Sequence, residues 1–277
     1  MTTAGTAWAS PSLSGRPRLV ATDLDGTLLR TDGTLSPRTA QVLAASEQAG
    51  IQVVFVTARP PRWLDALADA VAGHGTVICG NGAFVYEVGS RTVTEVHGFH
   101  PAVVADIVDD LRAAAPEVLF AGERAAGLWS EPGFPHDPSH EVPADAVRAS
   151  MDELGHVVLG KLLARSLRLG DDEFLGLVDE VVGDRGHVAY SGAGGLAEIS
   201  ARGVTKAAAL ERWATGLGIG ARDVWAFGDM PNDLPMLHWA GTGWAVANAH
   251  DDVRAVADRV CASNDDDGVA RELERVL

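Results

Sequence analysis

Cysteine and long hydrophobic runs are both scarce in this sequence. Among its 277 residues there are two cysteines, Cys79 and Cys261, and neither belongs to a CxxC pattern. The number excludes a disulfide-rich scaffold, and the spacing excludes a cysteine-based zinc site. We therefore expect two buried free thiols. No apolar stretch approaches the roughly 20 residues of a helix that crosses a membrane, so we expect no membrane partner.

Basic residues are also few. The chain has 22 Lys and Arg against 38 Asp and Glu, which gives a formal net charge of −16. Nucleic acids and anionic membranes attract basic surfaces, so this balance argues against both as partners. A phosphate substrate stays open, because a bound divalent cation can reverse the local charge. Residues 1–17 lack the basic and apolar regions of a secretory signal, so we expect a flexible tail and a cytoplasmic protein.

The stretch 19–29 is the one around which the rest of the sequence is organised. It opens on the apolar run LVA, which predicts a buried strand. Asp23 and Asp25 follow, one position apart, and Gly26 then allows a turn that a residue with a Cβ would resist. Ligands of open α/β sheets bind at the carboxyl ends of the strands. The pattern therefore predicts two carboxylates at a binding crevice.

Three more motifs follow. Residues 53–60 (VVFVTARP) form an apolar strand that ends at a threonine, residues 203–206 (GVTK) carry a lysine, and residues 224–233 (VWAFGDMPND) are a strand followed by GDxxND. Together with DLDGTL, and in this order, they resemble the four motifs of the haloacid dehalogenase superfamily of phosphohydrolases. ANA at 247–249 and DGVA at 267–270 are similar to its Cof-type subfamily.

Strand and helix patterns alternate on both sides of a central insertion. In residues 18–82 and 199–277 this alternation predicts a parallel sheet with right-handed crossovers, the α/β, Rossmann-like core of the family. Residues 83–198 mix hairpins, short strands and helices, which predicts an inserted α+β domain. The resemblance implies that this insert is a cap over the active site. Individual elements expected within this plan are a helix that starts with Ser36 as its cap and Pro37 at its first position, a hairpin of 84–87 with 92–97, and helices over 62–72, 144–154 and 171–182.

The resemblance implies that Asp23 is the nucleophile and that Asp25 is the general acid and base. A carboxylate nucleophile splits the slow hydrolysis of a phosphate monoester into two easier displacements, through an acyl phosphate. Asp25 would protonate the leaving oxygen and then activate the water that attacks the phosphoaspartate. The alternative interpretation is that these are ordinary turn residues.

The family also binds Mg²⁺, here with Asp23, the backbone carbonyl of Asp25, and Asp229. Magnesium prefers oxygen ligands and keeps water in its shell. Asp233 lies one helical turn after Asp229 and would orient a metal-bound water or the motif lysine. Asn232 would hydrogen-bond the phosphoryl group or its neighbours. Helix capping is the alternative role for these acidic and amide side chains.

Other motif residues would hold the phosphoryl group. Fixed donors aimed at its oxygens stabilise the transition state. Thr57 offers a hydroxyl, Ala58 a neighbouring backbone N–H, and Lys206 an ammonium at a helix start, while the turn at Gly26 lies beside the phosphate. A β-forming threonine and a surface lysine are the alternatives.

Residues outside the four motif positions are candidates for contact with the rest of the substrate. The loop over 130–143 supplies most of them, and a surface role is the alternative for each. Pro138 in that loop argues against a metal-binding helix. The candidates are Arg59, Asn81, Trp129 and His136, and in the same loop Glu131, Asp137 and His140.

We therefore expect a magnesium-dependent phosphomonoester hydrolase that acts through a phosphoaspartate on a small phosphorylated metabolite, such as a sugar phosphate or a phosphorylated cofactor. Its partner would be a small-molecule phosphate ester, and its state a monomer or homodimer. A phosphomutase or a dedicated sugar-phosphate phosphatase with a similar cap is an alternative. A non-catalytic phosphate-binding protein is an alternative of another class, because a fold alone does not give a function.

Overall fold

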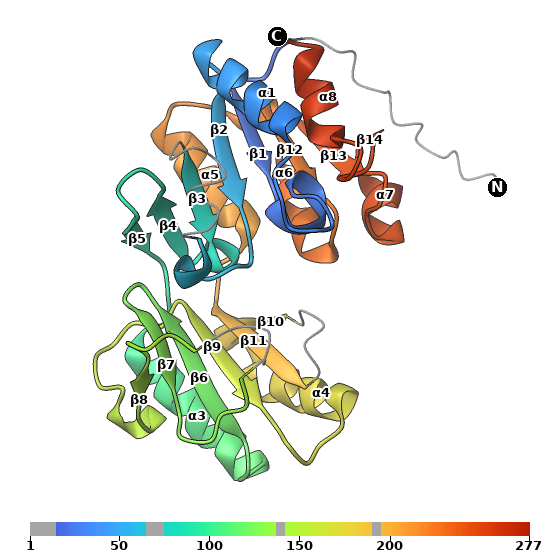
Figure 1. Cartoon of the computed structure of the whole chain (residues 1–277). Helices are drawn as coiled ribbons and strands as arrows, with labels where there is room; N and C mark the ends of the chain where they lie inside the picture. Colours follow the sequence, from blue (N-terminus) through green and yellow to red (C-terminus); the bar gives the residue numbers. More distant parts are fainter. Residues whose placement is uncertain (1–14, 65–74, 137–141, 190–194) are drawn as a thin grey trace, which may run out of the picture.

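The computed structural model describes residues 15–64, 75–136, 142–189 and 195–277. Within these residues the strands form two separate sheets, one of eight strands and one of six. Figure 1 shows the two sheets one above the other, joined by few chain crossings. Of the tail expected over residues 1–17, only residues 15–17 are among those described.

The eight-stranded sheet has the order β14-β13-β12-β1-β2-β3-β4-β5. Its strands from β14 to β3 run parallel, whereas β4 and β5 are antiparallel to their neighbours. The bounds are β1 Leu19–Thr22, β2 Gln52–Val56, β3 Thr76–Cys79, β4 Phe84–Glu87, β5 Thr92–Val96, β12 Val224–Gly228, β13 Thr242–Val246 and β14 Arg259–Cys261.

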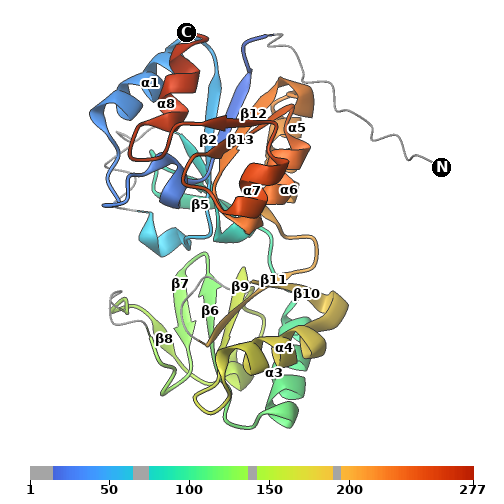
Figure 2. The same ribbon diagram turned by 90° about the vertical axis from the view of Figure 1, so that its right-hand side faces the viewer.

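Helices cover both faces of this sheet. Figure 2 shows α1 and α8 on one side and α5, α6 and α7 on the other. The central strands β1 and β12 are buried on both faces, which explains their continuous apolar sequences. The bounds are α1 Pro37–Gln48, α5 Lys206–Gly216, α6 Leu234–Trp239, α7 Asp251–Val256 and α8 Gly268–Glu274.

The six-stranded sheet has the order β10-β11-β9-β6-β7-β8 and is mainly antiparallel. Helices α3 (Pro101–Ala114) and α4 (Asp171–Val182) lie together along one of its faces (Figure 2). The strands are β6 Leu119–Arg124, β7 Gly127–Ser130, β8 Val147–Arg148, β9 Lys161–Arg165, β10 Gly186–Ala189 and β11 Leu196–Ala201. The expected α/β core with an inserted α+β unit is confirmed.

The hairpin expected over 84–87 and 92–97 exists, but its assignment to the insert is wrong. Its strands β4 and β5 extend the eight-stranded sheet, because Cys79 of β3 pairs with Phe84 of β4. Between β3 and β4, Asn81 adopts φ 58°, and the chain reverses its direction within Gly80–Gly82. The six-stranded unit therefore starts after this hairpin rather than at residue 83. At the other end of the six-stranded unit, strand β11 continues past residue 198, where the inserted domain was expected to end.

The helix expected over 144–154 is also wrong. The segment contains the short strand β8, which pairs with β7, and a single 3-10 turn over Met151–Glu153. A Ser150 cap defines the start of that turn, and Glu153 closes it. Strand pairing therefore determines the structure of this segment, although its local apolar periodicity favours a helix. Of the helix expected over 62–72, the described part is only a 3-10 turn over Pro61–Trp63, and the remainder falls largely on undescribed residues.

Both cysteines are buried and free, as expected. Among the described helices, none combines the length and apolar character that a membrane span requires. The main hydrophobic core extends through both units, with Leu19, Phe227 and Phe120 among its fully buried members.

Candidate active site

Three neighbouring strands place the motif side chains at one edge of the eight-stranded sheet. Asp23 follows β1, Thr57 follows β2 and Asp229 follows β12, and β1 pairs with both other strands in parallel. The carboxyl ends of these strands therefore meet. A cavity of about 950 Å³ lies there, lined by residues of both units.

Lys206 joins two of these acids. Its Nζ donates to Asp23 Oδ1 at 2.6 Å and to Asp233 Oδ1 at 2.7 Å. All three side chains are buried. The other oxygen of Asp233 accepts the backbone N–H groups of Asp229 and Met230, each at 3.1 Å. Asp233 thus fixes both the lysine and the turn that carries Asp229.

Burial governs the ionisation of this cluster. Burial away from water raises the pKa of Asp23 to about 8 and that of Asp229 to about 6. Lys206 acts in the opposite direction on Asp23, and the hydrogen bond from Thr27 does so on Asp229. Burial opposes charge on Lys206 too, but Asp23 and Asp233 outweigh it and raise the pKa of the ammonium. The carboxylates outnumber the lysine, so the cluster has room for additional positive charge.

The acids are placed to receive a cation. Carboxylate oxygens of Asp23, Asp229 and Asp233 lie within 4.8 Å of one another. Asp233 is engaged through both oxygens, by the lysine and two N–H groups, whereas Asp23 and Asp229 each accept a side-chain hydrogen bond through Oδ1. Asp23 and Asp229 are therefore the acids that could hold a metal. Gly26 keeps this space open: at φ 77° it carries no side chain, and a Cβ there would lie 2.4 Å from Asp229 Oδ2. Buried oxygen donors of this kind suit a hard divalent ion.

Two further contacts hold the opening loop against the last strands. Thr27 Oγ1 donates to Asp229 Oδ1 at 2.9 Å. The side-chain N–H of Asn248 donates to the Gly26 carbonyl at 2.7 Å. The motif that contains Asn248 is thus part of the site's support.

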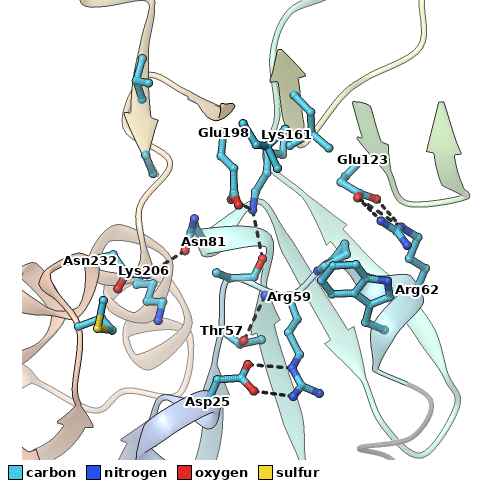
Figure 3. A pocket seen from close by; sticks show the side chains of 18 of the residues that line it. Asp25, Thr57, Arg59, Arg62, Asn81, Glu123, Lys161, Glu198, Lys206 and Asn232 are labelled. Carbon is cyan, nitrogen blue, oxygen red and sulfur yellow. Dashed lines mark hydrogen bonds and ion pairs between the residues drawn. The ribbon is translucent and has the colours of Figure 1, made fainter. Parts of the chain in front are cut away.

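Asp25 and Arg59 form an ion pair at the cavity. The guanidinium donates to both carboxylate oxygens, with Nε to Oδ2 at 2.8 Å and a second nitrogen to Oδ1 at 2.5 Å (Figure 3). The backbone N–H of Arg59 also donates to Thr57 Oγ1 at 3.1 Å. Arg59, which was expected to touch substrate, therefore lines the cavity but is committed to Asp25.

Asn81 and Asn232 both line the cavity, as expected. Their side chains approach one another at 3.5 Å, a contact at the outer limit of a hydrogen bond (Figure 3). Asn81 stands at the turn between β3 and β4, and Asn232 at the turn after β12. Ala58 also lines the cavity.

The expected substrate contacts from the inserted unit divide into two groups. His136 lines the cavity, and its Nε2 lies 3.0 Å from Ser130 Oγ. Trp129 is buried, donates to the carbonyl of Ala149 at 3.2 Å, and is not among the residues that line the cavity. Glu131 is buried too and accepts the backbone N–H groups of Phe120 and Met151, both at 3.0 Å. Residues Asp137 and His140 lie outside the described residues.

The sequence did not point to two buried ion pairs that line the cavity. Arg62 of the first unit donates to Glu123 on β6, with its shortest contact at 2.8 Å. Lys161 on β9 pairs with Glu198 on β11 at 2.5 Å, and its Nζ also donates to the Ala58 carbonyl at 3.2 Å (Figure 3). The alternation of side chains along β9 could have indicated that Lys161, Leu163 and Arg165 share one face of the sheet. It could not have indicated that this face lies toward the first unit.

Comparison with known proteins agrees with this geometry. A family model described as haloacid dehalogenase-like hydrolase matches residues 20–273. The 5-amino-6-(5-phospho-D-ribitylamino)uracil phosphatase YitU of Bacillus subtilis is 28% identical over 267 residues, covering 94% of this chain and 97% of the relative. The pyridoxal phosphate phosphatase YbhA of Escherichia coli is 29% identical over 282 residues, covering 92% and 96%.

A solved haloacid dehalogenase-like hydrolase from Bacteroides thetaiotaomicron is similar over the whole fold. It is 25% identical, with a TM-score of 0.76, and the match covers 95% of this chain and 100% of that chain. Since the family match spans both units and all four motifs, the chain belongs to the haloacid dehalogenase-like hydrolases and, among them, to the Cof-type phosphatases.

Proposed function

We propose that this protein is a magnesium-dependent phosphomonoester hydrolase that forms a phosphoaspartate on Asp23 and acts on a small phosphorylated metabolite. The observation that supports this most directly is the convergence of Asp23, Thr57, Lys206 and Asp229 at one cavity, from four separate parts of the chain. These groups are the nucleophile, the phosphoryl donors and the metal ligand that such a reaction needs.

Asp23, Asp229 and the backbone carbonyl of Asp25 would hold the metal. When bound, magnesium neutralises charge on the phosphoryl oxygens. The two carboxylates fit this role because they are buried and burial raises both pKa values, so a nearby cation would favour their ionised forms.

The remaining motif residues would hold the phosphoryl group. Thr57, Ala58 and Lys206 line the same cavity as Asp23, and Lys206 contacts Asp23 directly. The Thr57 hydroxyl, the Ala58 N–H and the Lys206 ammonium would be the donors. Hydrogen-bond donors fixed around the phosphoryl oxygens stabilise the charge on these oxygens in the transition state. Asn232 would add a side-chain amide, and Asp233 would keep Lys206 in place.

The chemistry has two displacements. An oxygen of Asp23 attacks phosphorus while the bond between phosphorus and the ester oxygen breaks, and Asp25 gives its proton to that leaving oxygen. Water then attacks the phosphorus of the phosphoaspartate, Asp25 takes the water's proton, and inorganic phosphate and the Asp23 carboxylate are released. The ion pair of Asp25 with Arg59 has to give way for each proton transfer.

The relatives support the substrate class. YitU and YbhA are named for phosphate esters of small metabolites, and they match this chain over almost their whole length. We therefore assign a small phosphate ester as the substrate.

The test is hydrolysis of p-nitrophenyl phosphate by the purified protein with and without Mg²⁺. The wild type should release phosphate only with the metal, and Asp23→Asn should lose at least about 10⁴-fold in kcat. Asp32→Asn is the matched control, because Asp32 is an exposed acid that bonds to Thr34 in its own turn. Full activity of Asp23→Asn, or an inactive wild type across a broad panel of esters, would contradict the proposal.

A further inference from the structure

The six-stranded sheet turns one face toward the cavity, and that face is mainly apolar. On β9 the residues that line the cavity are Lys161, Leu163 and Arg165, whereas Leu162 and Ala164 between them are completely buried. The alternation of side chains along a strand explains this division. Apolar side chains that line the cavity from this unit are Leu128, Phe134, Pro135, Val142, Leu163, Val188, Ala189 and Leu196.

The apolar residues form a continuous surface. Leu128 and Phe134 belong to one small hydrophobic cluster, and Val142, Leu163 and Leu196 pack against it. We call these five residues the apolar wall. In the register of the sheet Leu163 stands between Ala121 of β6 and Glu198 of β11, and Leu196 stands opposite Arg165. Charged side chains therefore border the wall.

Two ion pairs lie beside the wall, together with Arg165, whose guanidinium donates to the Pro135 carbonyl at 2.8 Å. Glu123 is paired with Arg62, and the two side chains are only 5% and 15% exposed. Lys161 is paired with Glu198, at 5% and 11% exposed. Each pair joins one positive and one negative group, so together they add no net charge to the cavity.

An aromatic edge completes this surface. The rings of Phe134 and His136 lie with their centroids 5.1 Å apart. Burial lowers the pKa of His136, which favours the uncharged imidazole. His136 thus continues the wall as a flat ring that makes a polar contact with Ser130.

We propose that the leaving group of the substrate is a planar aromatic or heteroaromatic ring that lies against the apolar wall, and that a sugar is a poor substrate. A volume of about 950 Å³ exceeds what a phosphoryl group alone fills, so a ring-sized group fits beside it. Sugar hydroxyls against the wall would lose water without gaining partners, whereas a ring buries apolar surface.

This inference rests on the proposed function, since it names the group released by that reaction. It is tested with four esters of primary alcohols, which makes their leaving oxygens chemically similar. Pyridoxal 5′-phosphate and flavin mononucleotide carry rings; glucose 6-phosphate and ribose 5-phosphate are sugars. We expect kcat/KM for the better ring ester to exceed that of the better sugar by at least about 10-fold.

Substitutions in the wall separate the contact from general damage. Leu163→Asn and Leu196→Asn should each lower the ring-to-sugar ratio by about 5-fold or more, because a polar group replaces apolar contact. Leu167→Asn is the control: this residue is in the same unit but 68% exposed. Thermal unfolding and hydrolysis of acetyl phosphate report whether each variant still folds and retains its phosphoryl chemistry.

The outcomes are distinct. If no ester and no acetyl phosphate is hydrolysed, the proposed function fails. If acetyl phosphate is hydrolysed but a sugar ester matches or exceeds both ring esters, the hydrolase stands and the ring inference is overturned. A ring preference that both folded wall variants leave unchanged would also overturn it, because the wall would not be its source.

Discussion

Lys206 and Asp23 are 183 positions apart in the chain, yet the lysine donates to the aspartate at 2.6 Å in a buried site. Neither side chain could occupy this environment alone, since an unpaired buried charge is strongly unfavourable. The pair therefore couples the start of the first unit to the segment that returns from the insert.

Lys206→Met should weaken both activity and stability. The variant leaves Asp23 and Asp233 buried without their shared cation, so we expect a loss of about 3 kcal/mol or more in the free energy of unfolding. Loss of the phosphoryl donor should lower kcat by about 100- to 1,000-fold. Urea denaturation at neutral pH and p-nitrophenyl phosphate hydrolysis measure the two effects.

The control for that variant is Arg202→Met. Arg202 pairs with Asp184 at 3.4 Å, but both side chains are largely exposed, at 75% and 87%. Exposed pairs contribute about 1 kcal/mol or less, so this variant should be nearly neutral. Equal destabilisation by the two substitutions would contradict the role assigned to Lys206.

Gly26→Ala should impair metal binding more than glycine replacement elsewhere. Gly26 and Gly33 have nearly the same backbone angle, φ 77° and 79°. A Cβ at Gly26 would meet Asp229 Oδ2 at 2.4 Å, whereas one at Gly33 would meet nothing within 4 Å. Gly33→Ala thus carries the backbone strain without the clash. Titration of activity with Mg²⁺ should show a raised half-saturating concentration for Gly26→Ala only, and similar values for both would refute the steric argument.

Stabilisation by magnesium should depend on pH. Burial raises the pKa of Asp229 to about 6 and that of Asp23 to about 8, from 3.8. In the metal-free protein these groups favour folding while protonated: their contribution is fully present below pH 3.8 and is lost as the pH rises through about 6 and about 8. A cation needs the ionised forms, so it competes with protons.

The increase in Tm on adding Mg²⁺ should therefore be largest above pH 8 and small below pH 6, where Asp229 holds its proton. Differential scanning fluorimetry across this range measures it. Asp229→Asn should show little increase at any pH. An increase of constant size throughout the range would mean that these carboxylates do not receive the metal.

The ion pair of Arg62 with Glu123 should be strongly coupled, because it joins the two units and is mostly buried. In a double-mutant cycle of Arg62→Met and Glu123→Leu we expect a coupling of about 1–3 kcal/mol in unfolding free energy, since each single change leaves a buried charge. Arg38 with Glu274 is the matched pair: it is also bidentate, at 2.8 and 2.6 Å, but 42% and 38% exposed. Its coupling should stay below about 1 kcal/mol, and the reverse order would show that burial is not the decisive factor.

Local signals were sufficient for some helices of both units. Ser36 before Pro37 predicted a helix start, and the Ser36 side chain does accept the N–H of Thr39. The helix predicted over 171–182 has those bounds in the structure. Over 144–154 the apolar residues are compatible with either a helix or a strand, and pairing with β7 made part of this segment a strand.

The candidate site was predictable mainly where its residues belong to motifs. Asp23, Thr57, Lys206 and Asp229 line the cavity as expected. The pairing of Arg59 with Asp25 was not foreseen, because 34 positions separate them and nothing local indicates a partner. Lys161 and Glu198 were missed for the same reason, at a separation of 37 positions.

The sequence alone determined the order of strands and helices in the core, the positions of Asp23 and the other motif residues, and the existence of an inserted unit, because these depend on local periodicity, turn residues and short motifs. Tertiary structure alone decided which sheet received the hairpin after Asn81, which acids Lys206 neutralises, and which face of the inserted sheet meets the cavity. Such matters depend on strand register and on contacts between distant segments, where burial makes an unpaired charge or a misplaced apolar side chain costly.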